Sequence, residues 1–210
     1  MAFQYSITAI GTTMVQMALN TLGSTYVAAF TAASKCEQMA GQAYIALGSA
    51  IATFAAQNVG AGRYDRVRKG FARTTEFGFI FSIVMGFVMY FFGYVVTGLF
   101  VSGDASALEG MVDVYMKFTA LFLFPLTIVN VYRNGIQGMG YGLLPMMAGV
   151  AELVGRGSVA LIAIHYHSYN GVCLASPMAW ILASALLLTM YFAIMRKHPV
   201  RKNGENTLDK

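Results

Sequence analysis

Charged residues are scarce in this 210-residue sequence and make up only 11% of it. Soluble globular proteins carry about 25% charged residues, so this chain has too little charge to form a polar surface in water. Asp, Glu, Lys and Arg are absent from residues 1–34, 38–62, 77–103 and 157–195. Because about 20 consecutive apolar residues cross a bilayer as a helix, the composition predicts an integral membrane protein.

The residues of common catalytic and metal sites are also missing. Cys36 and Cys173 lie in separate apolar segments without CxxC spacing, which argues against a disulfide framework or a cysteine metal site. No Walker A, HExxH or GxSxG motif occurs, and His165 and His167 are a weak basis for a metal site. We therefore expect no catalytic residues, no bound metal and no cofactor, and the protein is not expected to be an enzyme.

Six apolar segments are present, separated by short polar or glycine-rich stretches. Their polarity does not alternate as in a membrane β-barrel, and only helices satisfy the backbone in such runs. The expected fold class is an all-α membrane protein, with six transmembrane helices in one domain at residues 1–196 and a polar cytoplasmic tail at 197–210. The expected spans cover residues 3–22, 25–58, 76–100, 107–137, 144–166 and 172–195.

The basic residues predict an orientation in the membrane. Arg63, Arg66, Arg68, Lys69 and Arg73 follow the second apolar segment, and Lys and Arg beside a span favour the cytoplasmic side. With alternating loops, the other basic flanks fall on the same side, which places both termini in the cytoplasm of a plasma-membrane protein. These flanks also explain the net charge of +5, so no nucleic-acid partner is expected.

Polar side chains inside the spans are candidates for function, because each is costly there. Glu152 and Arg156 stand four residues apart, in the favourable order for an intrahelical ion pair. We expect them to form either a structural pair between helices or a gating or proton-linked pair. Lys117 is expected to extend its ammonium group towards the membrane surface. Asn130, Arg133 and Gln137 are expected to cap their helix or hold it against a neighbour rather than bind substrate.

Two further groups of polar residues lie in the first two segments. Lys35 and Glu37 are two residues apart, so they point in different directions from a helix. Either both are solvated at the headgroups, or one of them lines a water-filled cavity. Gln4, Gln16 and Asn20 interrupt the first segment, and a spacing of four puts Gln16 and Asn20 on one face. These amides either bond helices together or line a polar path.

The turn after the second segment resembles that of a known family. The apolar helix ends at a glycine-containing turn and continues into the basic cluster, in the manner of the multidrug and toxic compound extrusion (MATE) family. Residues 135–156, with a Gly-Met-Gly turn, Pro145 and Glu152, are similar to the C-terminal lobe of the same family. The resemblance covers nearly all of residues 1–196. The motif residues are Gln57, Asn58, Gly60, Ala61, Gly62 and Arg66.

The resemblance implies a secondary active transporter. Members of the family are twelve-helix antiporters of two six-helix lobes, which export cationic or amphipathic compounds against Na⁺ or H⁺ by alternating access. The six segments match the second lobe, so the resemblance implies a missing N-terminal lobe as partner and a chain that is a fragment. The implied partners are drug-like or cationic small molecules and the lipid bilayer.

One departure from the family pattern concerns the coupling ion. Some family members place a Glu in the first helix of this lobe and an Asp in the fourth as a cation site. Those positions fall near Gln4 and Leu126, neither of which is acidic. The identity of the coupling ion is therefore left open by the sequence.

Two alternatives to a drug exporter remain. A lipid-linked oligosaccharide flippase has a related architecture and needs several basic residues for phosphate. Here Arg156 is the only basic residue expected near mid-membrane, with Lys35 and Lys117 nearer the outer side, so this alternative ranks second. A non-transporting membrane scaffold is the third possibility, because six spans alone need not form a complete pathway.

Overall fold

The computed structural model describes residues 2–98 and 108–199, without the side chains of residues 2–5 and 96. Seven α-helices and no strand occur in these residues. In chain order they are α1 (Ala2–Leu22), α2 (Ser24–Gly60), α3 (Tyr64–Gly98), α4 (Glu109–Leu121), α5 (Leu123–Gly138), α6 (Leu143–His165) and α7 (Tyr169–Lys197).

Most helix boundaries lie within three residues of the expected spans, and two features differ more. The third helix begins at Tyr64, twelve residues before the expected 76, because the basic stretch continues the helix and Asp65 in its first turn favours the positive end of the helix dipole. The fourth segment is two helices bent by 53°, which meet at the non-helical Phe122. Pro125 lies just after this break, and a proline clashes with the carbonyl four residues before it.

Four of these helices are long and apolar enough to cross a membrane: α2, α3, α6 and α7. The bent pair of α4 and α5 raises the number to five if it forms one span. The described residues therefore form a multi-pass membrane protein, while six spans remain an expectation because seven helices are seen and α1 does not meet the same criterion.

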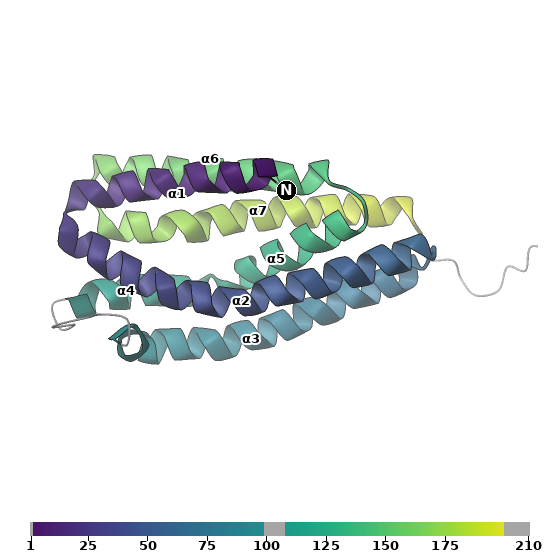
Figure 1. Ribbon diagram of the computed structural model, residues 1–210, viewed down its shortest axis with the longest axis horizontal. Helices are drawn as coiled ribbons and strands as arrows, with labels where there is room; N and C mark the ends of the chain where they lie inside the picture. The colour runs from purple at the N-terminus through teal and green to yellow at the C-terminus, as the bar shows by residue number, and fades with distance from the viewer. Residues whose placement is uncertain (1, 99–107, 200–210) are drawn as a thin grey trace, which may run out of the picture.

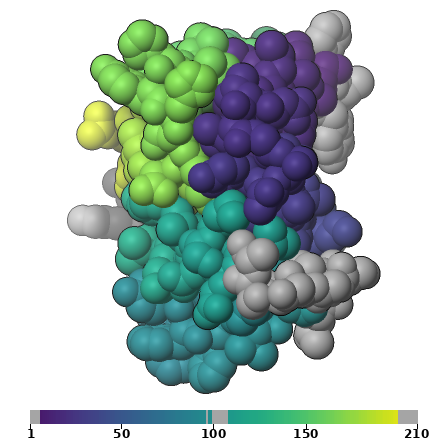
Figure 2. Space-filling model, turned by 90° about the vertical axis from the view of Figure 1, so that its left-hand side faces the viewer, coloured from purple at the N-terminus to yellow at the C-terminus, as the bar shows by residue number. Residues whose placement is uncertain are grey.

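The helices are arranged in two groups along one long axis (Figure 1). In one group α1 lies along α6, and α6 packs along α7. In the other, α2 and α3 form a long hairpin, with α4 against α3. The α5 helix crosses between the groups and contacts both α2 and α7. Seen end-on, the side chains of α1 and α6 lie side by side above those of α3 and α4 (Figure 2).

Glycines allow α2, α3 and α5 to approach one another closely. A Cβ atom on Gly138 would collide with the backbone of Ala52, and one on Gly135 would collide with the ring of Phe71. Small residues at such crossings let membrane helices pack through their backbones. The close crossing of α2 and α5 determines the position of the α2 side chains relative to the rest of the bundle.

The end of α7 is tied to two other parts of the fold. The Arg68 guanidinium on α3 donates to the carbonyl oxygens of Met195 at 2.6 Å and His198 at 3.0 Å. The Tyr64 ring stacks on the His198 imidazole with 4.0 Å between the ring centroids. The Tyr141 hydroxyl, from the turn between α5 and α6, lies 3.5 Å from His198 Nε2. One histidine therefore connects three chain segments at this end of the molecule.

Candidate functional site

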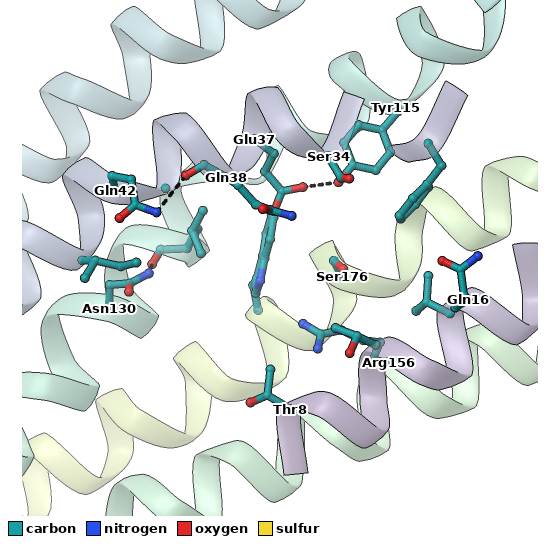
Figure 3. A pocket seen from close by; sticks show the side chains of 17 residues that line it. Thr8, Gln16, Ser34, Glu37, Gln38, Gln42, Tyr115, Asn130, Arg156 and Ser176 are labelled. Atoms are coloured by element: carbon teal, nitrogen blue, oxygen red, sulfur yellow. Dashed lines mark hydrogen bonds between the residues drawn. The ribbon is translucent and has the colours of Figure 1, made fainter. Parts of the chain in front are cut away.

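A cavity of about 450 Å³ lies among the helices and is lined by residues of α1, α2, α4, α5, α6 and α7 (Figure 3). Arg156, Tyr115 and Trp180 are buried and form its inner wall, while Gln16, Gln38 and other exposed residues lie at its open side. Its polar lining residues are Thr8, Thr12, Gln16, Ser34, Glu37, Gln38, Gln42, Tyr115, Asn130, Arg156 and Ser176.

Glu37 is the acidic residue of this cavity. It is half-buried on α2 and accepts a hydrogen bond from the Tyr115 hydroxyl of α4. Tyr115 is itself held by an edge-to-face contact with Phe30, with 4.8 Å between the ring centroids. Of the two interpretations made for Lys35 and Glu37, the geometry favours a cavity position for Glu37. Lys35 is exposed and lines a shallow neighbouring hollow instead.

Arg156 enters the cavity from the wall opposite Glu37 (Figure 3). It is only 6% exposed, and its Nε has no hydrogen-bond partner in the part of the chain that the structure describes. A Cβ atom on Gly11 of α1 would come within 3.4 Å of the arginine side chain. The Arg156 side chain therefore lies against α1 at Gly11.

The expected ion pair between Glu152 and Arg156 is wrong. Glu152 pairs instead with Arg133 of α5, with 2.5 Å between Oε1 and Nη2. Residues four apart on a helix differ by about 40° in direction, and here that difference sends Glu152 towards α5 and Arg156 towards α1 and the cavity. The expectation that Arg133 holds its helix against a neighbour is confirmed by this contact.

The other candidates from the sequence are dispersed. The Gln16 Nε2 donates to Asn20 Oδ1 at 3.1 Å, which confirms that they share a face, but only Gln16 lines the cavity. The side chain of Gln4 is outside the described residues. Lys117 pairs with Asp113 at 2.6 Å, and its ammonium lies 5.5 Å from the centre of the Tyr90 ring.

Several cavity residues were missed, although a pattern in the sequence could have revealed them. Polar residues recur every four positions on α1 and again on α2, and this spacing keeps them on one face of each helix. The stripe on α1 is Thr8, Thr12 and Gln16, and the stripe on α2 is Ser34, Gln38 and Gln42. Asn130, expected to cap or hold its helix, also lines the cavity. Tyr115, Ser176 and Trp180 carry no comparable pattern, since their position depends on how the helices pack.

Comparison with known sequences identifies the family. A family model described as MatE matches residues 1–161, which is most of the chain. The chain belongs to the MatE family. Members of this family are membrane transporters, so this MatE chain is not an enzyme. The matched range includes Glu37, Tyr115 and Arg156 of the cavity wall.

Solved structures share the fold of this MatE chain. An outward-facing multidrug resistance MATE family transporter of the MOP superfamily superposes with a TM-score of 0.87 at 16% identity, over 94% of this chain and 45% of that one. A MOP superfamily transporter from Pyrococcus furiosus gives a TM-score of 0.85 at 17% identity, again over 94% of this chain and 45% of that one. At such identities the likeness concerns the fold alone.

A curated relative is also longer than this MatE chain. A protein named FAD transporter from Shewanella oneidensis is 25% identical over 183 residues, which cover 87% of this chain and 40% of that protein. The chain thus spans less than half of the length of the transporters to which it is similar.

The glycine-containing motif of this MatE chain lies at the turn between α2 and α3, outside the cavity lining. Gly62 has a φ of +68°, a left-handed conformation that glycine adopts without strain and that commonly ends a helix. The Asn58 side chain donates to the Phe54 carbonyl at 2.8 Å, and the Arg63 backbone amide donates to the Asn58 carbonyl at 2.8 Å. These contacts give Asn58 and Gly62 a role in forming the turn. Gln57, Gly60, Ala61 and Arg66 complete the same segment.

Proposed function

We propose that this chain forms one six-helix lobe of a twelve-helix MATE-type antiporter, which exports cationic or amphipathic compounds across the plasma membrane by alternating access. The main support is the cavity of about 450 Å³, which gathers many polar side chains, together with apolar ones, inside an apolar helical membrane protein. Pockets of about 300–1,000 Å³ are of the size that binds drug-like molecules. Polar stripes on α1 and α2 supply hydrogen-bonding groups, and Trp180 and Phe30 supply aromatic surface.

The coupling cation, Na⁺ or H⁺, is proposed to bind at Glu37. This residue is the carboxylate in the cavity lining, and the bond from Tyr115 fixes its position. Ionisable residues inside membrane segments commonly mark ion pathways. Leu126, near one of the positions where some family members have an acid, also lines the cavity, so Glu37 is proposed to take the place of that carboxylate.

A second six-helix lobe is proposed to complete the pathway. The chain covers 45% of each of two solved transporters, so a structure of that size leaves room for another lobe. In this arrangement the turns at Gly62 and Gly140, together with the end of α7, lie on the cytoplasmic side. The basic cluster from Arg63 to Arg73 adjoins the first of these turns, in agreement with the preference of Lys and Arg for that side.

Transport in proteoliposomes tests this proposal. The chain is reconstituted alone and together with the N-terminal lobe of a MATE transporter, and efflux of ethidium, norfloxacin and FAD is followed under a Na⁺ or pH gradient. We expect gradient-driven efflux only when both lobes are present. Efflux by the chain alone would contradict the need for a second lobe. No efflux under either condition would favour a scaffold.

The role of Glu37 is tested in the same vesicles. Glu37→Gln should abolish the dependence of efflux on the cation gradient, because the amide takes up no proton at neutral pH and lacks the negative charge that compensates Na⁺. Glu76→Gln is the matched control, since its carboxylate is exposed and pairs with Arg73 on the surface of α3. Gradient-dependent efflux by Glu37→Gln at equal protein levels would remove Glu37 from the coupling mechanism.

A further inference from the structure

Among the described residues no acidic side chain contacts the buried Arg156, and Glu37 interacts with its charge only across the cavity. The residue is 94% buried, since only 6% of its surface is exposed, and arginine carries a positive charge in proteins. The nearest acidic residue on its own helix, Glu152, is engaged by Arg133. Among the described residues, Arg156 forms no ion pair within 4.0 Å, and its Nε has no hydrogen-bond partner.

The surroundings of Arg156 direct this charge into the cavity. Its side chain lies against Gly11 of α1, and the guanidinium points towards the centre of the lining (Figure 3). Glu37 lies on the opposite wall, where it accepts its bond from Tyr115. Glu37 interacts with the arginine charge across the cavity but does not contact it. A buried charge without a contacting partner is costly, so a negatively charged group that reaches the guanidinium on the α6 side would gain a strong partner.

We propose that Arg156 is an anion-binding site of the cavity, which selects, among amphipathic compounds, those that combine an aromatic body with a carboxylate or phosphate group. Binding of such compounds stands on the cavity alone, whereas their transport as substrates rests on the proposed function. A guanidinium binds carboxylate or phosphate through two parallel N–H···O bonds, which fix orientation as well as charge. Trp180 and Phe30 line the same cavity and offer aromatic surface for the rest of the molecule.

The polar stripes assign places to the other groups of such a compound. Thr8 and Thr12 of α1 lie on the helix that packs against α6, and so on the Arg156 side of the cavity. Gln38 and Gln42 lie on α2, on the side of Glu37. The anionic group is thus directed towards α1 and α6, and neutral donors or an amine are directed towards α2.

The tryptophan in the cavity wall makes binding measurable without transport. The sequence contains a single Trp, Trp180, which is 5% exposed and lines the cavity. Quenching of its fluorescence in the purified full chain therefore reports a ligand in or near this cavity. The probes are 4-nitrobenzoate and 4-nitrobenzamide, which share a ring and nearly the same shape but differ in charge. Calorimetric titration gives the affinities independently of quenching.

We expect the carboxylate to bind more tightly than the amide in the unmodified chain. Arg156→Gln should weaken 4-nitrobenzoate binding by about tenfold to hundredfold, in line with the loss of hydrogen bonds to a charged group, and leave 4-nitrobenzamide almost unchanged. Arg156→Lys should give an intermediate affinity, because lysine keeps the charge without the planar fork. Arg196→Gln is the matched control: it removes an exposed arginine at the end of α7 and should change neither affinity.

Two results would overturn the anion site. One is equal affinity of the unmodified chain for both probes, and the other is an equal loss for both in Arg156→Gln, which would indicate a collapsed cavity. If Arg156→Gln does not fold, Arg156→Lys provides the test. A ratio of the 4-nitrobenzoate and 4-nitrobenzamide affinities that is the same as in the unmodified chain would contradict recognition by the guanidinium group. A carboxylate preference without efflux in vesicles would refute the proposed transport alone, whereas efflux without this preference would refute the anion site alone.

Discussion

The buried ion pair between α5 and α6 permits a direct thermodynamic measurement. Glu152 is 4% exposed, and its carboxylate lies 2.5 Å from the Arg133 guanidinium. Removing one member of a buried pair leaves the other charge uncompensated, at a cost of about 3–5 kcal/mol. We expect Glu152→Gln and Arg133→Gln each to lower the free energy of unfolding by about this amount, and the double variant to cost much less than the sum.

A double-mutant cycle separates this pair from the intrahelical pair that the sequence predicts. Glu152→Gln is combined once with Arg133→Gln and once with Arg156→Gln, and each protein is unfolded by urea or heat in a mild detergent. Contacting residues couple by about 0.5–3 kcal/mol, while independent sites add within about 0.5 kcal/mol. The coupling of Glu152 should lie towards the upper end of this range with Arg133 and close to zero with Arg156.

The same cycle can refute the assignment. A coupling energy between Glu152 and Arg156 that equals or exceeds that between Glu152 and Arg133 would show that the intrahelical pair forms in solution. It would also remove the argument for an unpaired Arg156, because the guanidinium would then have a carboxylate partner on its own helix.

Three further predictions concern the packing and the ends of the helices. Gly138→Leu drives a side chain into the backbone of Ala52, and such overpacking should cost about 1–3 kcal/mol, seen as a lower thermal unfolding midpoint. Gly62→Val forces a β-branched residue to a φ of +68° and should cost about 1–2 kcal/mol in the same assay. Arg68→Gln removes the donor to the Met195 carbonyl, so hydrogen exchange in the last turn of α7 should be faster by about tenfold.

Controls for these variants lie close to each site. Gly60→Ala is expected to leave the unfolding midpoint almost unchanged, because a Cβ atom there meets nothing within 4 Å. A midpoint for Gly138→Leu equal to that of Gly60→Ala would contradict the close crossing of α2 and α5. Arg66→Gln, on the exposed face of α3, should not alter exchange at the end of α7. Equal exchange in Arg66→Gln and Arg68→Gln would show that Arg68 does not hold α7.

The sequence alone predicts a membrane protein, because the evidence for it lies in short, continuous stretches of the chain. The uncharged stretches and the basic cluster after α2 are one-dimensional patterns, and each can be interpreted without knowing the neighbouring helices. Pro125 likewise predicts a kink, because its ring clashes with the carbonyl oxygen four residues before it. The 53° bend between α4 and α5, however, places the break at Phe122, since the packing of both helices decides where the strain is relieved.

The cavity depends on contacts between distant segments, which local patterns do not contain. The sequence places Glu152 and Arg156 on similar faces of one helix, but only the position of α5 shows that Arg133 takes the carboxylate. The polar stripe on α1 was readable from its spacing of four residues. This stripe lines the same cavity as the stripe on α2, together with Tyr115 and Trp180. Their meeting depends on the packing of six helices.

The contacts of His198 determine where this chain can be extended for experiments. The Tyr64 ring stacks on its imidazole and Arg68 bonds to its carbonyl, although the last helix already ends at Lys197. A fluorescent protein or affinity tag joined directly after Lys197 would replace the ring on which α3 rests, and would loosen α3 and the α5–α6 turn together. A fusion that retains His198 and the following residue preserves these contacts. The added protein should therefore begin after residue 199 and not at the end of the helix.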